Sequence, residues 1–145
     1  MNTRCYEKAI SLLAGAEHCR KGLARKLSSR GFDEEEITAA LQRLTEENLL
    51  DDRRFAGLWI EFRQRRTNEG RRLLEAGLLK RGVDRETAAA AVNAYAGTEP
   101  YNEAFDRARE RILRAGEPRG EELVSGLLRK GFTINEIRSR LADRE

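Results

Sequence analysis

Nine basic side chains lie between residues 53 and 81, and only three acidic ones accompany them. They are Arg53, Arg54, Arg63, Arg65, Arg66, Arg71, Arg72, Lys80 and Arg81. Charge is balanced elsewhere, with 8 basic and 8 acidic residues in 1–50 and 11 and 12 in 82–145. The planar guanidinium of arginine matches phosphate and carboxylate oxygens, so this excess indicates a surface for a polyanion or an acidic protein. A solvated charged surface without a partner is the alternative.

The other reactive side chains do not form a catalytic set. Asp51 and Asp52 could bind a metal, but adjacent residues at a helix start diverge, which favours helix capping. His18 shows no arrangement of Ser or Cys, His and an acid around it, and together with Cys5 and Cys19 it falls short of the four ligands of structural zinc. We expect reduced thiols, because a reducing cytosol argues against a disulfide. We therefore expect no catalytic, cofactor-binding or metal-binding residues, and no enzymatic activity.

A glycine corner recurs along the chain and indicates how the basic residues are positioned. Gly31, Gly82 and Gly131 lie 51 and 49 residues apart. A leucine precedes each glycine by four residues and another by eight: Leu27, Leu78 and Leu127, then Leu23, Leu74 and Leu123. One supersecondary unit is thus written three times, and repeats of this period usually build binding surfaces.

The apolar spacing is helical throughout, and no run alternates as a strand would. The expected helices span 4–15, 19–30, 34–47, 52–66, 70–81, 85–95, 100–115 and 119–130, followed by a last helix with Ile137 and Leu141. Each corner glycine is expected to end a helix in the left-handed conformation. Asp33 with Glu36, and Thr133 with Glu136, predict capping boxes, while Asp84 is a further helix cap. Gly116-Glu117-Pro118 is expected to form a turn.

These features predict an all-α protein of three tandem three-helix repeats. The repeats are expected at 1–50, 51–97, which is the basic one, and 98–145. Units this small and this charged are marginal alone, so neighbours should share core in an elongated, curved array.

The helix expected at 52–66 has one aromatic face. Phe55, Leu58, Trp59 and Phe62 fall at i, i+3, i+4 and i+7, so we expect them to pack in the core. Base stacking by Trp59 is the alternative. Ile60 points away from that face, and we expect a neighbouring unit to bury it.

The chain has no run of about 18 apolar residues that could cross a membrane. Its beginning lacks the continuous apolar stretch of a signal peptide. We therefore expect a cytoplasmic protein without membrane contact, and nothing demands more than a monomer.

The basic repeat resembles a known family. The segment Leu49-Leu50-Asp51-Asp52-Arg53-Arg54-Phe55-Ala56, followed by Trp59, Arg63 and Gly70, resembles the signature of the RecX family, bacterial regulators of the RecA recombinase. The resemblance extends over essentially the whole chain, since the corners also fit. The chain departs from the family pattern at Gly77, where an acidic residue is usual, and at Arg20, where serine is frequent.

The resemblance implies a role in DNA recombination, repair and the SOS response. The chain would lie in the groove of the RecA–single-stranded DNA filament and inhibit the recombinase, ATPase and coprotease activities of RecA. Arg63, Arg66, Arg71 and Arg72 are the strongest candidates for that contact, and binding of double-stranded DNA stays open. The alternatives are a sequence-independent DNA-binding protein without a recombinase partner and a scaffold that binds other helices.

Overall fold

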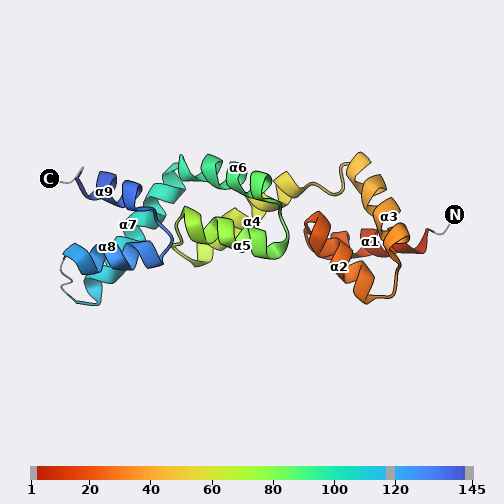
Figure 1. Cartoon of the computed structure of the whole chain (residues 1–145), viewed down its shortest axis with the longest axis horizontal. Coiled ribbons are helices and arrows are strands. Elements are labelled where there is room, and N and C mark those ends of the chain that lie inside the picture. Colours follow the sequence, from red (N-terminus) through yellow and green to blue (C-terminus); the bar gives the residue numbers. More distant parts are fainter. Residues whose placement is uncertain (1–2, 117–119, 143–145) are drawn as a thin grey trace. The chain divides into compact units, whose positions relative to one another are not determined.

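The computed structural model describes residues 3–116 and 120–142, and in those ranges the chain folds into nine helices and no strands (Figure 1). The helices are α1 (Arg4–Gly15), α2 (Arg20–Ser29), α3 (Glu34–Glu46), α4 (Asp52–Arg66), α5 (Arg71–Arg81), α6 (Arg85–Ala96), α7 (Glu99–Arg114), α8 (Gly120–Arg129) and α9 (Ile134–Ala142). The all-α prediction is confirmed. Helix ends in the described ranges lie within one residue of those expected, whereas most of the turn expected at 116–118 falls outside them.

The three corners have the same backbone geometry. Gly31, Gly82 and Gly131 have φ of +91°, +106° and +98°, in the left-handed region that glycine alone enters without strain. At each corner the glycine amide and the next amide bond back to the last turn of the preceding helix, as Gly31 does to Ser28 and Phe32 to Leu27. The predicted glycine caps are therefore confirmed as three copies of one helix-ending motif.

The helix beginnings are capped as the sequence predicts. Asp33 accepts from the Glu36 amide at 2.8 Å, and the Glu36 carboxylate accepts from the Asp33 amide in return. Thr133 and Glu136 exchange the equivalent two bonds. The Asp84 carboxylate accepts from the amide and the hydroxyl of Thr87. Each cap satisfies amides that a helix beginning leaves without intrahelical partners.

The terminal repeats each surround a core of their own. In the first, α1, α2 and α3 contact one another around a buried cluster (Figure 1). Its members are Cys5, Ala9, Leu23, Leu27, Ile37, Ala40, Leu41, Leu44 and Leu50. In the third, α8 contacts both α7 and α9 around an aromatic core. There the Phe132 ring lies 5.0 Å from Phe105 and 5.7 Å from Tyr101, centroid to centroid.

The second repeat is divided between two compact units. The first unit comprises residues 1–58 and 78–88, and the second comprises 59–77 and 89–145. Each unit thus contains one terminal repeat and part of the second repeat, joined at a glycine corner.

In the second unit, the corner at Gly131 holds the beginning of α5. The Gly70 amide donates to the Lys130 carbonyl oxygen at 2.7 Å, and the Arg72 amide donates to the Gly131 carbonyl oxygen at 2.9 Å. The amide between them, on Arg71, donates to the Tyr101 hydroxyl. The first amides of α5 are therefore satisfied by the third repeat rather than by a local cap.

In the first unit, the corner at Gly82 holds the beginning of α2 in a similar way. The Cys19 thiol donates to the Arg81 carbonyl oxygen at 3.2 Å. A Cβ added to Gly82 would lie 2.8 Å from Cβ of Lys21, so the two segments approach as closely as glycine allows. The Arg20 amide donates to the Asp52 carboxylate at 2.7 Å.

The prediction of which face of α4 packs in the core is wrong in part. Ala56 and Ile60 are the buried residues, at 0% and 2% exposure, whereas Leu58 is 43% and Phe62 is 55% exposed. Trp59 is partly buried, and the tip of its indole lies against Gly77 of α5. The prediction that Ile60 is buried is confirmed. The exposure of Phe62 has a physical reason. Gly77 has no side chain and makes room for the Trp59 ring, and this packing turns α4 so that Phe62 faces outward.

Candidate nucleic-acid interface

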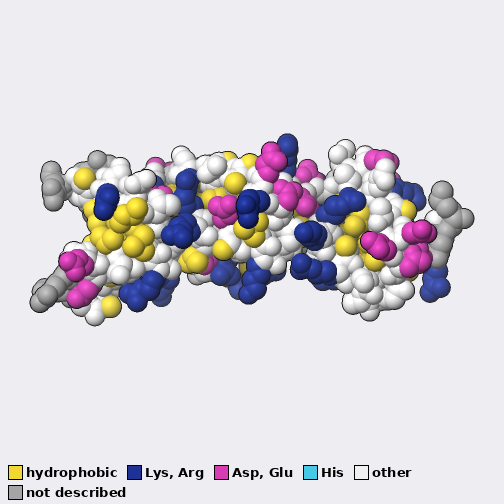
Figure 2. All heavy atoms as spheres, viewed as in Figure 1, with side chains coloured by type: hydrophobic (Ala, Val, Ile, Leu, Met, Phe, Trp, Pro, Cys, Tyr) yellow, Lys and Arg dark blue, Asp and Glu magenta, His cyan; other side chains and the backbone are white. Residues whose placement is uncertain are grey.

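The nine basic candidates differ in exposure. Six are exposed: Arg53, Arg65, Arg66, Arg72, Lys80 and Arg81. The other three, Arg54, Arg63 and Arg71, are partly buried. On the face drawn in Figure 2, Lys and Arg side chains are scattered among uncharged atoms and carboxylates and do not form an unbroken sheet. On that face, the cationic side chains are therefore separate from one another.

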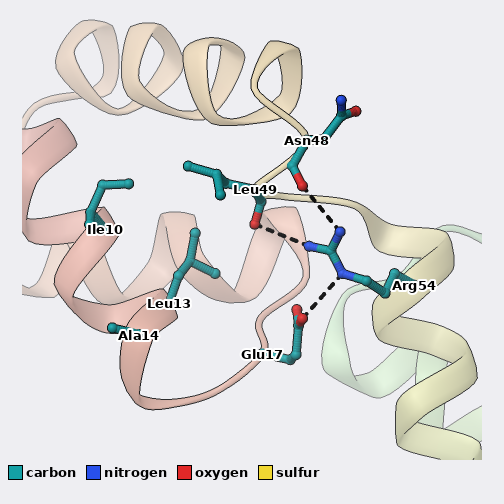
Figure 3. A pocket seen from close by; sticks show the side chains of 7 residues that line it. All are labelled: Ile10, Leu13, Ala14, Glu17, Asn48, Leu49 and Arg54. Atoms are coloured by element: carbon teal, nitrogen blue, oxygen red, sulfur yellow. Dashed lines mark hydrogen bonds and ion pairs between the residues drawn. The ribbon is translucent and has the colours of Figure 1, made fainter.

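Arg54 is held by the protein itself (Figure 3). Its guanidinium donates to the carbonyl oxygens of Asn48 and Leu49 at 3.1 and 3.2 Å, and to the Glu17 carboxylate at 3.1 Å. These groups edge a surface hollow of about 460 Å³ that is otherwise lined by Ile10, Leu13 and Ala14. With its donors engaged in this way, Arg54 fastens the loop before α4 to the end of α1.

Arg63 is likewise committed to an internal contact. Its Nε donates to the Glu69 carboxylate at 2.6 Å, and the same oxygen accepts from the Thr67 hydroxyl at 3.0 Å. The hydrogen bond to Glu69 and the attraction between the charges raise the pKa of Arg63. The guanidinium also lies 5.8 Å from the centre of the Trp59 ring. Arg63 therefore braces the 67–70 loop.

Arg66 lies beside an exposed aromatic ring. Its guanidinium is 4.8 Å from the centre of the Phe62 ring, within the range of a cation–π contact. Arg65 and Arg72 are exposed and make no hydrogen bond or ion pair through their side chains within the described ranges. Of the five candidates from Arg63 to Arg72, these three can reach an anionic partner.

Arg71 is placed differently from its neighbour Arg72. Its side chain is partly buried, and its Nε is fully buried without a hydrogen-bond partner in the described structure. Its backbone amide is bound to Tyr101. The structure therefore makes Arg71 part of the joint with the third repeat.

The candidates fall into two groups according to the two units. Arg53, Arg54, Lys80 and Arg81 belong to the first unit. Arg63, Arg65, Arg66, Arg71 and Arg72 belong to the second. Within the second unit, Arg63 and Arg66 come from adjacent turns of α4, and Arg71 and Arg72 begin α5.

The remaining reactive side chains have structural contacts. Asp51 caps α4 by accepting from the Arg53 amide at 2.9 Å, and Asp52 accepts from the first amide of α2. The capping interpretation is therefore confirmed for Asp51, whereas Asp52 caps α2 instead of its own helix. His18 is buried, with Nδ1 2.7 Å from the Ala16 carbonyl oxygen and Nε2 2.8 Å from Nζ of Lys26. Both cysteines are buried free thiols, and the described residues contain no cluster with three or more metal-ligating side chains.

Sequence reasoning missed Phe62 as a surface residue. Helical spacing alone places it with Phe55 and Trp59, whereas the structure exposes its ring beside Arg66. Two signals were present in the chain. Ala56 and Ile60 offer an alternative buried pair at i and i+4, and Gly77 departs from the expected residue type where the Trp59 ring packs.

Two family models match the chain. Residues 5–44 match the first three-helix domain of RecX, and residues 51–92 match its second three-helix domain. The matched segments coincide with α1–α3 and with α4 to the middle of α6. Among the described residues, no helix is both long and apolar enough to span a bilayer.

Relatives with the same name align over most of the chain. The regulatory protein RecX of Chlorobaculum tepidum is 35% identical over 132 residues, which cover 91% of this chain and 82% of the relative. The RecX of Stenotrophomonas maltophilia is 37% identical over 135 residues, with the same coverage. The crystal structure of RecX from Lactobacillus salivarius has the same fold, with a TM-score of 0.86 at 22% identity over 97% of this chain and 94% of that one.

Proposed function

Because the chain belongs to the RecX family, we propose that it regulates the RecA recombinase by binding the RecA–single-stranded DNA filament. In this proposal the bound protein inhibits strand exchange, ATP hydrolysis and the coprotease activity of the filament, and does no chemistry of its own. The relatives are named regulatory proteins, which agrees with a role that is not enzymatic.

The observation that carries the proposal is the presence of exposed arginines without internal partners in the second unit. Arg65 and Arg72 extend into solvent, and Arg66 lies over the exposed Phe62 ring. A guanidinium fork binds phosphate oxygens through two parallel hydrogen bonds. An exposed aromatic ring beside it can stack on an unpaired base, as in other proteins that bind single strands.

Inhibition follows from occupancy in this proposal. A chain of three repeats can contact more than one RecA protomer, and several weak contacts held on one chain give strong overall binding. The arginines would neutralise DNA phosphates or acidic RecA side chains along the groove. A second DNA strand could then no longer enter, and the movements coupled to ATP hydrolysis would be restrained.

The test is RecA ATPase on single-stranded DNA, titrated with the protein. The variant replaces the three exposed arginines: Arg65→Ala, Arg66→Ala and Arg72→Ala. Arg63 and Arg71 are left in place because they hold internal contacts. The matched control removes three exposed arginines of the third repeat: Arg111→Ala, Arg129→Ala and Arg138→Ala.

We expect the variant to need about ten times more protein for half-inhibition, since three lost charge contacts of about 0.5 kcal/mol each add to about 1.5 kcal/mol. The control should stay within about threefold of the unmodified chain. Equal loss in both variants would show that general charge matters rather than this surface. Tight binding to DNA without RecA, with no effect on RecA itself, would favour the sequence-independent DNA-binding alternative. That alternative also predicts an affinity for DNA that falls steeply with salt.

A further inference from the structure

The corner at Gly31 differs from the other two because, among the described residues of its own unit, no helix packs on it. A Cβ added to Gly31 would meet no atom within 4 Å, whereas at Gly82 and Gly131 it would lie 2.8 Å from Lys21 and Leu73. Gly31 is exposed, while Gly131 is buried. All three corners share their left-handed φ and their hydrogen bonds to the preceding turn. In the second and third repeats, the corner surface holds the beginning of another helix. In the described part of the first unit, the same surface of the first repeat is uncovered.

The two helix beginnings that occupy corners have a common chemistry. α2 begins with Arg20-Lys21 and α5 begins with Arg71-Arg72, and neither has an acidic residue in its first turn. Cations at a helix beginning oppose the helix dipole, at a cost of up to about 1 kcal/mol each. At both joints the carbonyl-bearing end of another helix faces this first turn and offsets that cost. A corner in this chain therefore accepts a basic first turn.

A carboxylate follows the corner at Gly82 and complements the basic first turn of α2. Asp84 comes two residues after Gly82. Hydrogen bonds from Thr87 lower the pKa of its carboxyl group, and the positive charge of Lys21 lowers it further. At the uncovered corner the carboxylates are more numerous. Asp33, Glu34, Glu35 and Glu36 follow Gly31 in the sequence, and Glu34 and Glu35 are exposed.

The beginning of α3 is also hollowed and electrically negative. Glu34 and Glu35 line a surface hollow of about 460 Å³ together with Thr38, Ala39 and Gln42. Burial raises the pKa of the nearby Cys5 thiol, and the carboxylates of Glu36 and Asp33 raise it further. A long basic side chain from a docked helix would find room and opposite charge there.

A second copy of this chain does not offer a suitable helix with a basic first turn. Its α8, the second helix of the third repeat as α2 and α5 are of theirs, would be the equivalent occupant, but that helix has exposed Glu121 and Glu122 in its first turn. These would face Glu34 and Glu35, and like charges placed together oppose association. The charge pattern therefore favours a different protein as the occupant.

We infer that the corner at Gly31, with Glu34 and Glu35, is a docking site for the basic first turn of a helix in a partner protein. The occupant would lie on Gly31 as α2 lies on Gly82 and α5 on Gly131. Donors at its beginning would bind the corner carbonyl oxygens, as the Cys19 thiol and the Gly70 amide do at the other two corners, and its basic side chains would lie on α3. Naming RecA as that partner rests on the proposed function. The chain would then have two separate contact surfaces. The Gly31 corner would bind protein, and the arginines of the second unit would bind DNA.

The first test needs no RecA. A peptide with residues 18–29 of this chain, closed into a helix by a lactam bridge, is titrated into the full-length ¹⁵N-labelled protein. We expect saturable shifts of the Gly31 and Phe32 amides. The same peptide with Arg20→Glu and Lys21→Glu should bind at least ten times more weakly. Absence of shifts at Gly31, or equal binding of both peptides, would overturn the inference.

A pair of variants of the whole protein makes the test specific. Glu34→Lys with Glu35→Lys reverses the charge at the corner, and Glu121→Lys with Glu122→Lys makes the same change at the beginning of α8. Both pairs are exposed, so both variants should fold. We expect the first variant to bind the peptide at least tenfold more weakly and the second to bind within about twofold of the unmodified protein. Equal effects would overturn the inference.

The same two variants then identify the partner. We expect the Glu34→Lys, Glu35→Lys variant to lose at least tenfold in affinity for the RecA–single-stranded DNA filament, without weaker binding to DNA alone. An unchanged filament affinity would exclude RecA as the occupant of the corner. If the unmodified protein does not bind the filament, the proposed function fails, and the peptide titration still decides whether the corner is a docking site.

Discussion

The indole ring of Trp59 lies against the backbone of Gly77, so that a Cβ added to the glycine would fall 2.9 Å from Cζ2 of the ring and closer still to its tip. Glycine inside a helix costs about 1 kcal/mol relative to alanine. The close approach explains why this cost is accepted in α5. It also fixes which face of α4 is buried.

Gly77→Ala should therefore destabilise the protein, by about 1–3 kcal/mol, because overpacking outweighs the gain in helix propensity. Gly57→Ala is the control, since Gly57 also lies inside a helix and has no atom within 4 Å of an added Cβ. That change should stabilise by about 0.5–1 kcal/mol. Urea unfolding of both variants measures the difference. Equal stabilisation by both would contradict the packing of Trp59 on Gly77.

The corner glycines allow a similar comparison. Gly131→Ala adds a Cβ 2.8 Å from the Leu73 amide nitrogen, besides forcing alanine to φ of +98°. We expect a loss of about 2–4 kcal/mol, from left-handed strain of 1–2 kcal/mol together with overpacking. Gly31→Ala meets no neighbour and should lose only the strain, about 1–2 kcal/mol. Chemical unfolding monitored by circular dichroism decides whether the two losses differ.

The hydroxyl of Tyr101 joins two repeats within the second unit, since it accepts from the Arg71 amide and donates to the Glu136 carboxylate at 2.9 Å. Burial raises the pKa of this hydroxyl well above its ordinary value of about 10. The folded state therefore keeps a proton that the unfolded chain releases, so stability is full below pH 10 and falls as the pH rises beyond it.

Tyr101→Phe should cost about 1–3 kcal/mol at pH 8, because the Arg71 amide loses its acceptor and the Glu136 carboxylate keeps only the Thr133 amide as a donor among the described residues. The variant should also lose less stability than the unmodified protein between pH 9.5 and 11. Urea midpoints at a series of pH values test both statements. Parallel pH curves for the two proteins would show that Tyr101 is not the titrating group.

Two substitutions in α4 test whether Ile60 or Phe62 is its core residue. Ile60→Ala should destabilise by about 2–4 kcal/mol, since it empties a buried site, whereas Phe62→Ala should change stability by less than about 0.5 kcal/mol. If Phe62 were a core residue, as helical spacing alone predicts, the two costs would be alike. Thermal melts of the two variants distinguish these outcomes.

Helix positions could be predicted from the sequence because their signals are local. The Asp33–Glu36 and Thr133–Glu136 boxes and the corner glycines act within a few residues of one another, so spacing is enough to find them. The buried face of α4 could not be predicted in this way. Its two faces have similar apolar content, and the choice between them depends on Gly77, which lies on another helix.

The candidate site was predictable in location but not in detail. Charge imbalance identified the segment 53–81, and six of its nine basic residues are exposed. Arg54 and Arg63 form ion pairs with Glu17 and Glu69. A sequence does not show which carboxylates lie close to these arginines in space. The joints at the corners were missed because their bonds link residues far apart in the chain, 30 positions for Arg71 and Tyr101 and 62 for Cys19 and Arg81.

Because both ends of α5 take part in joints, this protein is not a set of modules that can be removed one at a time. Deleting α7–α9 would take away the carbonyl oxygens and the phenol that satisfy Gly70, Arg71 and Arg72. The helix that carries Arg72 would then begin with bare amides in water, and it would fray at the turn that displays this arginine. A truncated chain would thus lose order at a candidate contact residue that it still contains.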